Sequence, residues 1–545
     1  MKTLTEQFTI QSIDLEINSR PSRSIDCNFN LNQDSSQELH WPGANGRIVI
    51  QNQRNGYRIK LFLTCERQLE HVSITADLSK SISHVFCNGY NDWTASREFK
   101  LNEQWGRTRL ILRYLAGAMT DIHFVEPTIR GPKSDKRSHE WTILRNKDQA
   151  LFIGSLNDFD AFTYFEYTNS SKIIIHRDVN GWLLNNETCI ADLWISETGY
   201  NNLSELFETF FMLKNLPPLR TKPATGYTSW YYHYNQIVPS QIESVITSFQ
   251  MNQIPIDFIQ IDDGTQKRVG DWLDLKPEFG QSLKPLVEKI HGAGFKAGLW
   301  LAPFVAEAKS NLIKNHPDWI AKDEFGRRIK AGFNPLWSYW FYVLDLQNSE
   351  VRQYLKNVFQ VVLNDWNFDL LKLDFLYAAA LQNPKSMTRS QLMTDAVDLI
   401  HEATGWKPGQ PHSYDKKNGP LLLGCGIPPS AAIGKFDFCR IGSDVKESWE
   451  DNLLKFMRYQ ERVSTYNSLL STIGRWPYNG RGFWNDPDVF YLRENYRALK
   501  PKEKKKKLPM TEVEKTTLLL LNHVIGSLII TSYPVHEYDQ ETLNR

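Results

Sequence analysis

Cysteine is sparse in this sequence and is not arranged for metal binding. Only six cysteines occur in 545 residues, and no two of them form a CxxC pair. We therefore expect no zinc site built on paired cysteines, and six cysteines are too few to indicate a disulfide scaffold. The first residues contain no apolar stretch of signal-peptide length. Together these features predict a reducing, cytoplasmic setting.

The sequence also lacks a long apolar run and an excess of charge of either sign. No stretch approaches the roughly 20 apolar residues of a membrane-spanning helix, so we expect no membrane partner. Lys and Arg number 63 against 62 Asp and Glu, which leaves a net charge of +1. This balance argues against a nucleic-acid partner recognised through bulk charge. The oligomeric state is left open, with a homo-oligomer as one option.

The first part of the chain, residues 1–215, has the pattern of a β-sandwich domain. Short β-branched or alternating runs at 48–50, 57–64 and 172–176 are separated by turn signals such as Asn45-Gly46 and Asn55-Gly56. Many short strands with few helical stretches are typical of a sandwich. A predicted helix over 203–214 is followed by several prolines, which break regular structure. We place the domain boundary there.

The second part, residues 225–545, alternates strands with helices. Strands are predicted at 226–231, 258–262, 296–301, 370–376, 421–425, 436–441, 483–491 and 527–531. Helices are predicted between them, including 240–251, 282–292, 349–364, 390–403, 448–465 and 511–523. This order predicts an α/β fold, a (β/α)₈ TIM barrel. A doubly wound open sheet is the alternative, but no Gly-rich phosphate loop follows the first strand.

Lys372 and Asp374 are the two charged residues in the apolar run Leu370–Leu376. In a strand, residues two apart share one face, so the two side chains are expected to point the same way. A barrel strand carries such groups at its C-terminal mouth, where substrate arrives. A structural ion pair at a strand end is the alternative. A lysine beside Asp374 would favour the ionised carboxylate.

Other carboxylates and aromatics follow neighbouring strands of the predicted barrel. Asp262 and Asp263 end strand two, Trp300 ends strand three, Cys425 ends strand five, and Arg440 and Asp444 follow strand six. Two facing carboxylates, one ionised and one protonated, are the minimum for glycoside hydrolysis. Adjacent aspartates can accept hydrogen bonds from sugar hydroxyls, and a tryptophan offers an apolar floor to a sugar ring. Asp486 and Asp488 are interpreted as part of a structural turn.

Seven short motifs in order give this part of the chain a family resemblance. They are Gln260–Gly264, Gly298–Phe304, His316–Trp319, Lys372–Phe375, Gly424–Gly426, Arg440–Asp444 and Asn485–Asp488. The barrel resembles the clan D, glycoside hydrolase family 36 α-galactosidases. The resemblance implies that Asp374 is the nucleophile and Asp444 the acid/base. It implies a galactose pocket lined by Asp262, Asp263, Trp300, Lys372, Cys425 and Arg440.

One loop of the N-terminal part shares the resemblance. Residues Asn88–Trp93 are similar to the family's amino-domain loop, whose tryptophan reaches over the active site. Trp93 is therefore predicted to contact the sugar. The chain departs from the family in having Ile427-Pro-Pro429 where many members carry a glycine-rich run. The usual C-terminal β-domain is not visible in this sequence.

The resemblance implies a retaining exo-α-galactosidase that uses no cofactor and no metal. Its partner would be a small-molecule α-galactoside of the melibiose or raffinose type. Two rival functions remain on the same fold, galactosyl transfer and cleavage of α-N-acetylgalactosamine. A catalytically silent carbohydrate-binding relative is a third alternative, against which the intact pair of Asp374 and Asp444 argues.

Overall fold

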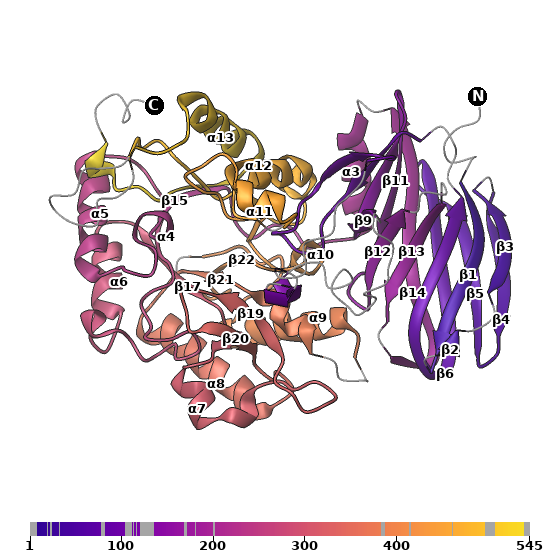
Figure 1. The fold of residues 1–545 in the computed structure, drawn as a ribbon, viewed down its shortest axis with the longest axis horizontal. Helices are drawn as coiled ribbons and strands as arrows, with labels where there is room; N and C mark the ends of the chain where they lie inside the picture. Colours follow the sequence, from indigo (N-terminus) through magenta and orange to yellow (C-terminus); the bar gives the residue numbers. More distant parts are fainter. Residues whose placement is uncertain are drawn as a thin grey trace.

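The computed structural model describes two structural parts, a β-rich part and a barrel, which lie side by side (Figure 1). The described residues are 8–538, with gaps at 19, 22–23, 32, 78–81, 104–111, 113, 116, 120–135, 168–171, 180, 200–201, 383–386, 414–415, 460–461 and 496–506. Among these described residues, no helix has the length and the apolar character needed to cross a membrane.

Antiparallel strands build the β-rich part. The strands are β1 (Thr9–Ile17), β2 (Arg20–Pro21), β3 (Ile25–Asn30), β4 (Ser35–Trp41), β5 (Ala44–Asn52), β6 (Gly56–Asp77), β7 (His84–Cys87), β8 (Arg97–Lys100), β9 (Lys136–His139), β10 (Trp141–Arg145), β11 (Gln149–Ser155), β12 (Phe162–Tyr167), β13 (Lys172–Asp178) and β14 (Trp182–Gly199). The long β6 pairs with β5 and β14 along its first half, and with β1 and β13 along its second half. Alternating side chains from these strands fill a common core. The β-rich architecture predicted for this part is confirmed.

A ring of parallel strands forms the barrel. The strands are β15 (Ala224–Thr228), β16 (Phe258–Ile261), β17 (Lys296–Leu301), β21 (Leu370–Leu373), β22 (Leu421–Gly424), β23 (Phe438–Arg440), β24 (Trp484–Asp486), β25 (Val489–Phe490) and β26 (Leu528–Thr531). The strands pair in parallel in the order β24-β23-β22-β21-β17-β16-β15-β26-β25, and the register of β26 with β15 sets Leu528 opposite Ala224. The predicted (β/α)₈ barrel is confirmed.

The seventh strand of the ring is interrupted. Its first piece, β24, pairs with β23, and its second piece, β25, pairs with β26. Pro487 and Asp488 lie between the two pieces. Proline cannot donate to the ladder, and Asp488 has a φ of 74°, outside the conformations of a regular strand. The ring therefore closes through a break rather than through a continuous strand.

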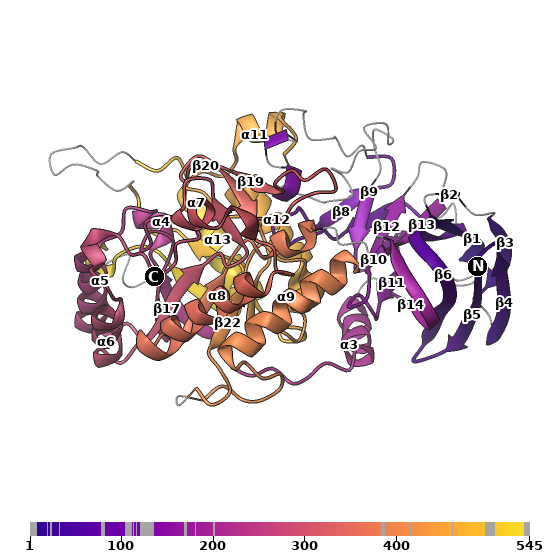
Figure 2. The same cartoon turned by 90° about the horizontal axis from the view of Figure 1, so that it is seen from below.

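Helices surround the ring and cover its outer face (Figures 1 and 2). The helices of the barrel part are α4 (Trp230–His233), α5 (Pro239–Met251), α6 (Lys284–Gly292), α7 (Asn311–Asn315), α8 (Ser349–Gln360), α9 (Arg389–Thr404), α10 (Pro429–Ala432), α11 (Asn452–Phe456), α12 (Thr465–Gly474) and α13 (Glu512–Ile525). The helix before the barrel, α3 (Leu203–Leu213), lies instead against β14 of the β-rich part. A π-helical turn, Val361–Asp365, extends α8, and short 3₁₀ turns lie at Gly117–Met119, Pro277–Phe279, Pro317–Trp319, Leu376–Leu381, Trp476–Tyr478 and Val535–Glu537.

Two element predictions are wrong. The helix predicted over 448–465 is instead two helices, α11 and α12, because Asp451 and Ser464 each cap a separate start with a side-chain oxygen. Such caps favour a new helix at the following residue. The strand predicted over 226–231 ends at Thr228, and the chain turns into the short α4. Pairing with β16 accounts for this end, since the register stops at Thr228 opposite Gln260.

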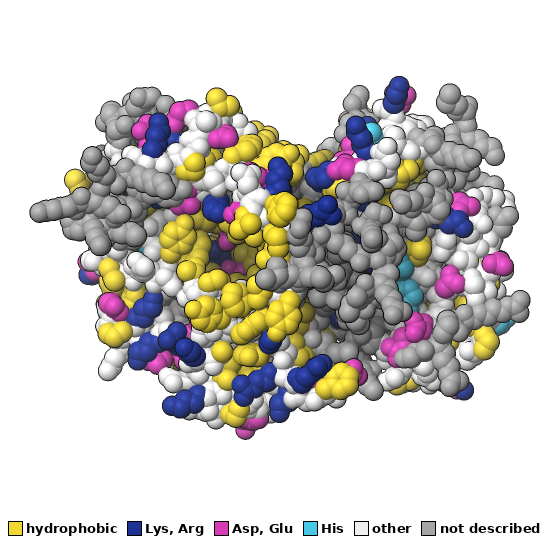
Figure 3. Space-filling model, viewed as in Figure 1, with side chains coloured by type: hydrophobic (Ala, Val, Ile, Leu, Met, Phe, Trp, Pro, Cys, Tyr) yellow, Lys and Arg dark blue, Asp and Glu magenta, His cyan; other side chains and the backbone are white. Residues whose placement is uncertain are grey.

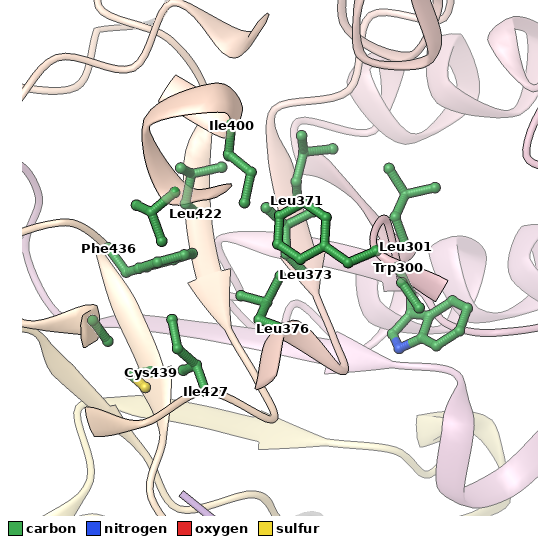
Figure 4. Close-up of a cluster of buried hydrophobic side chains, with 14 of the residues drawn as sticks. Trp300, Leu301, Leu371, Leu373, Leu376, Ile400, Leu422, Ile427, Phe436 and Cys439 are labelled. Atoms are coloured by element: carbon green, nitrogen blue, oxygen red, sulfur yellow. The ribbon is translucent and has the colours of Figure 1, made fainter. Parts of the chain in front are cut away.

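Apolar side chains beneath the mouth of the barrel join the ring to its helices. Figure 4 shows Leu371, Leu373 and Leu422 of the strands beside Ile400 of α9 and Phe436. All five are buried. Near-continuous apolar runs are expected in parallel strands that are covered on both faces. This packing fixes the strand ends that carry the polar residues described next.

A small antiparallel sheet is inserted after β17. It consists of β18 (Val305–Glu307), β19 (Lys330–Asn334) and β20 (Tyr339–Val343), in the order β18-β20-β19. Its β19–β20 loop carries Leu336 and Trp337. Both residues line the cavity at the mouth of the barrel, so the insert forms one wall of that cavity.

Candidate active site

A cavity of about 360 Å³ opens at the C-terminal ends of the barrel strands. Figure 3 shows it as a hollow with hydrophobic side chains around its edge and charged side chains inside. Of the residues predicted from the sequence to form the site, Trp93, Asp262, Asp263, Trp300, Lys372, Asp374 and Asp444 line this cavity. Cys425 and Arg440 lie behind the lining and contact it through Asp374 and Asp444.

Asp374 follows directly on β21 and is held by several donors. The indole Nε1 of Trp300 donates to its Oδ2 at 2.9 Å, and the backbone N–H of Phe375 donates to its Oδ1 at 2.8 Å. Its own backbone N–H donates to the carbonyl of Leu301 at 2.8 Å, which continues the pairing between β17 and β21. The side chain is 8% exposed. Asp374 therefore has one fixed orientation at the mouth of the fourth strand.

The pKa of Asp374 differs from the sequence-based expectation. Burial raises the pKa of this carboxyl, while the charge of Lys372 and the hydrogen bonds from Trp300 and Cys425 lower it; the net direction is upward. Lys372 was expected to be the partner of Asp374, but its Nζ donates instead to Asp262 Oδ2 at 2.9 Å. Without a direct ion pair, desolvation outweighs the nearby positive charge.

Lys372 and Asp262 form a buried ion pair across the mouth, between the ends of β21 and β16, which are separated by β17. Asp262 Oδ2 also accepts from the side-chain amide of Gln260 at 3.0 Å, and the backbone N–H of Asp262 donates to Ser229 Oγ at 2.9 Å. Burial lowers the pKa of Lys372, but the negative charges of Asp262 and Asp374 raise it by more. The net pKa is raised, so the ammonium stays charged. A fixed cation therefore stands within the cavity.

Asp263 is held by partners of its own. Trp337 Nε1 donates to its Oδ2 at 2.8 Å, and Gln266 Nε2 donates to its Oδ1 at 2.6 Å. Burial raises its pKa to about 6, although both hydrogen bonds lower it. The two adjacent aspartates thus lie in different environments, one beside an ammonium and the other between neutral donors.

Asp444 lies in the loop after β23 and is the most exposed of the site carboxylates. Its side chain is 41% exposed, and Arg440 Nη1 donates to its Oδ1 at 3.0 Å. The same guanidinium bonds Asp486 at 2.9 Å and contacts Asp488 at 3.0 Å. Arg440 itself is 2% exposed. One buried guanidinium therefore connects the loop of Asp444 to the interrupted seventh strand.

The N-terminal part contributes Trp93 to the cavity. Its ring contacts Phe375 edge to face at a centroid distance of 5.2 Å. The neighbouring Asp92 accepts from the backbone N–H groups of Gly426 and Ile427 at 3.0 and 3.2 Å. The loop of residues 88–96 between β7 and β8 is thereby joined to the segment that follows the fifth barrel strand, and Trp93 is held beside the residue after Asp374.

Arg475, after α12, fixes this loop from the barrel side. Its guanidinium donates to the carbonyls of Asn91 and Thr94, each at 2.8 Å, and to the carbonyl of Asp92. It also donates to Ile441 in the barrel at 2.9 Å. The side chain is fully buried, and it also donates to Asn88 Oδ1 at 3.2 Å, so its charge is compensated by several acceptors of this loop and by Asp92 nearby.

Sequence reasoning missed several residues of the site. Asp488 was interpreted as part of a turn, yet it is buried, contacts Arg440, and accepts from the backbone N–H of Val445 at 2.9 Å. Trp337 and Tyr234 line the cavity from loops that no motif marked. A strand followed by Asn-Asp-Pro-Asp was the available signal for Asp488, since polar residues at a barrel strand end face substrate.

Three residues at or next to the cavity have an unusual backbone conformation. Tyr234, Phe375 and Asp488 all have positive φ values, 48°, 55° and 74°. Such conformations are unfavourable for residues with a side chain and persist where the surroundings hold them, often at functional sites. Among the described residues, no group of three or more His, Cys, Asp or Glu side chains is arranged to hold a metal ion.

Comparisons with known proteins show that part of the chain is similar to α-galactosidases. Residues 196–397 match the melibiase family model. The chain is 26% identical over 195 residues to α-galactosidase 2 of Pediococcus pentosaceus, covering 34% of this chain and 26% of that protein. It is 25% identical over 262 residues to α-galactosidase Mel36A of Lactobacillus acidophilus, covering 42% of this chain and 34% of that protein. The matched region thus spans only a quarter to a third of these relatives.

Solved structures share the fold over nearly the whole chain. TtGalA, an α-galactosidase from Thermus thermophilus in complex with p-nitrophenyl α-D-galactopyranoside, has a TM-score of 0.72 and 24% identity, covering 94% of this chain and 93% of that chain. The family 36 α-galactosidase AgaA from Geobacillus stearothermophilus has a TM-score of 0.57 and 11% identity, covering 99% and 74%. Over residues 196–397 the chain is thus similar to the melibiase family, and it shares its fold with solved α-galactosidases.

Proposed function

We propose that the chain is a retaining exo-α-galactosidase that releases terminal α-linked galactose. One observation carries the proposal: Asp374 and Asp444 line the same cavity in contrasting environments. Asp374 is 8% exposed and held by Trp300 and a backbone N–H, whereas the side chain of Asp444 is 41% exposed in a loop. A fixed carboxylate suits nucleophilic attack, and a solvent-accessible one suits proton exchange.

In the proposed reaction, Asp374 attacks the anomeric carbon while Asp444 protonates the oxygen of the leaving group. Asp444 then removes a proton from water, and that water displaces Asp374 from the covalent galactosyl-enzyme. Lys372, Trp300 and Cys425 each favour the ionised form of Asp374, the form that attack requires. A retaining mechanism needs the two carboxyl groups close together, and a separation of roughly 5–6 Å between Asp374 and Asp444 stays a prediction.

The polar residues of the cavity support recognition of galactose. Asp262 and Asp263 carry carboxylate oxygens toward the cavity, and Lys372 supplies a buried ammonium. Protein groups that hydrogen-bond one particular sugar hydroxyl disfavour the epimeric sugar, because they are left unpaired when that hydroxyl points elsewhere. Solved structures with a similar fold include the α-galactosidase TtGalA in complex with stachyose and a variant of the α-galactosidase AgaA in complex with raffinose. For this chain we propose oligosaccharides with a terminal α-galactose, such as the melibiose and raffinose types.

Replacing Asp374 by Asn tests the assignment of the nucleophile. We expect Asp374→Asn to lose at least about 10³-fold in kcat on p-nitrophenyl α-galactoside, because the amide cannot form the covalent intermediate. Its thermal unfolding should stay near that of the wild type. Asp365→Asn, an exposed aspartate after α8, is the matched control and should retain full turnover. Near-normal turnover in Asp374→Asn would disprove the role.

Retention and the rival functions are tested by product analysis. A retaining enzyme releases α-galactose first, which ¹H NMR distinguishes from the β anomer before mutarotation. A panel of aryl α-galactoside, α-glucoside and α-N-acetylgalactosaminide separates the sugar alternatives, and added acceptor sugars report transfer. No turnover on any of them would favour the silent carbohydrate-binding alternative. The domain limits of 1–215 and 225–545, the cytoplasmic setting and the oligomeric state stay predictions.

A further inference from the structure

The cavity changes character from its base to its mouth. Deep residues are almost fully buried, with Asp262 at 3% and Lys372 at 6% exposed. At the mouth, Leu336 is 51%, Tyr234 is 40% and Val463 is 38% exposed, and all three line the same cavity. We call these three residues, together with the half-buried Trp230 and Trp337 beside them, the apolar rim. Figure 3 shows hydrophobic side chains around the edge of the hollow.

The apolar rim is assembled from loops that follow three different barrel strands. Trp230 and Tyr234 belong to α4 and its end after the first strand, Leu336 and Trp337 belong to the insert after the third, and Val463 precedes α12 after the sixth. Exposed aliphatic and aromatic side chains that converge on one opening are uncommon on a protein surface without a binding role. Convergence from three loops indicates a binding surface rather than isolated exposed residues.

Charged groups next to the rim are already engaged. Lys446 Nζ pairs with Asp451 at 2.8 Å, and Glu447 pairs with Arg493 at 2.7 Å. A second sugar ring bound at the mouth would need donors and acceptors for its hydroxyls, and unmatched hydroxyls disfavour binding. Among the residues that the structure describes, the surface that a ligand could cover at the mouth is therefore mainly apolar.

Tyr234 is held at the mouth in a strained conformation. Its φ of 48° and ψ of −145° are outside the regions that side-chain-bearing residues favour. Its hydroxyl donates to Glu447 at 3.2 Å, and its ring meets Trp230 edge to face at 5.4 Å. Strain of this kind persists when neighbouring groups fix it. The ring is thereby preorganised at the opening, which lowers the entropy lost when a ligand covers it.

The direction of the leaving group follows from Asp444. If Asp444 protonates the glycosidic oxygen, the galactose lies deeper, toward Asp374, and the leaving group extends outward. We propose that the apolar rim binds the leaving group through its carbon surface, and that the preferred substrates are α-galactosides with an alkyl or aryl aglycone. This inference rests on the proposed α-galactosidase function and refines it: the same cavity accepts the melibiose and raffinose types but prefers alkyl and aryl α-galactosides.

Two alkyl galactosides test this inference without a difference in leaving-group reactivity. Methyl and octyl α-galactoside release alcohols of similar acidity but differ in the apolar area that the rim can cover. We expect wild-type kcat/KM to be at least tenfold higher for octyl than for methyl α-galactoside, assayed below the micelle concentration, and higher for octyl α-galactoside than for melibiose. The near-isosteric double variant Leu336→Asn with Val463→Thr should bring the octyl-to-methyl ratio close to one.

Leu453→Asn is the matched control. Leu453 is 70% exposed on α11 and does not line the cavity, so the wild-type ratio should persist in this variant. An octyl-to-methyl ratio near one in the wild type would overturn the inference, as would a ratio that is unchanged in the double variant. Hydrolysis of melibiose in preference to octyl α-galactoside would also overturn it while leaving the α-galactosidase function intact. Failure to cleave any galactoside, with the fold retained, would instead refute the proposed function itself.

Discussion

Asp444 is bonded by a single guanidinium and open to solvent, which suits a group that exchanges protons twice in each cycle. We expect Asp444→Ala to reduce kcat/KM strongly for melibiose and far less for p-nitrophenyl α-galactoside, because a nitrophenolate leaves with little protonation. The second step still needs a base, so a burst of nitrophenol should precede slow turnover. Pre-steady-state absorbance measures the burst. Equal losses on both substrates without a burst would contradict an acid/base role.

Asp263 gives the protein a predictable dependence of stability on pH. Burial raises its folded-state pKa to about 6 from 3.8, so the folded state holds the proton more tightly than the unfolded state does. The resulting stabilisation is present below about pH 4 and is lost as pH rises through about 6, an effect of at most about 3 kcal/mol. We expect Asp263→Asn to flatten the fall in unfolding free energy between pH 4 and 6, measured by urea denaturation. Superimposable pH profiles for the two proteins would contradict this.

The sequence predicted which residues lie at the mouth of the barrel better than it predicted their hydrogen-bond and ion-pair partners. The alternation of a strand and the convergence of strand ends were enough to bring Asp262, Trp300 and Asp374 to one mouth. The pairing of Lys372 with Asp262 was not predictable, because it depends on the alignment of two strands far apart in the chain. The raised pKa of Asp374 was missed for a related reason, since burial is a property of the packed site and not of neighbours in sequence.

At the element scale, α9 starts at a capping box that also contacts the β-rich part. Thr388 Oγ1 accepts from the backbone N–H of Gln391 at 3.0 Å, and Gln391 Oε1 accepts from the backbone N–H of Thr388 at 2.9 Å. The same hydroxyl donates to the carbonyl of Asp160. We expect Thr388→Ala to lower the unfolding free energy by about 1–2 kcal/mol, and Thr388→Ser to recover most of it. Denaturant titration checks both variants, and equal loss in Ala and Ser would argue against the cap.

The limits of strands and helices were predicted correctly where the local sequence signals agreed. They were predicted wrongly where two residues in one stretch could each cap a helix. The third strand was predicted over 296–301 and observed as Lys296–Leu301, since an apolar run is bounded there by a glycine-containing turn. The helix predicted over 448–465 failed because Asp451 and Ser464 both start helices in one polar stretch. Periodicity detects a helical stretch, but it does not tell which of two caps starts it.

At the scale of the whole molecule, Arg475 holds the β-rich part against the barrel. Removing its guanidinium leaves several buried carbonyls without this donor and takes away the larger of the two positive charges that act on Asp92. We expect Arg475→Met to lower the unfolding free energy by about 3 kcal/mol or more and to raise KM for galactosides through displacement of Trp93. Arg327→Met, at an exposed ion pair, should change neither. An unchanged KM in a destabilised Arg475→Met would limit the residue to a structural role.

The order of strands in the barrel was predictable from the alternating pattern, since parallel barrels follow chain order. The contact between the two parts was predicted only at Trp93, through a motif. Arg475 gave no signal, because an arginine in an amphipathic stretch is usually at the surface. Its burial follows from carbonyls presented by a loop nearly 400 positions earlier, which no local pattern reveals.

The break in the seventh strand has a consequence for the newly made protein. Asp488, at the break, contacts the guanidinium that bonds Asp444 and accepts from the backbone beside it. The ring closes only when Leu528–Thr531 pairs with Ala224–Thr228 and with the second piece of the broken strand. A nascent chain that has emerged as far as β23 and its following loop already carries Asp374 and Asp444, but it lacks Asp488, which contacts the guanidinium that bonds Asp444. Under the proposed function, a nascent chain stalled before Leu528–Thr531 has emerged would therefore be inert, although its catalytic aspartates are already present.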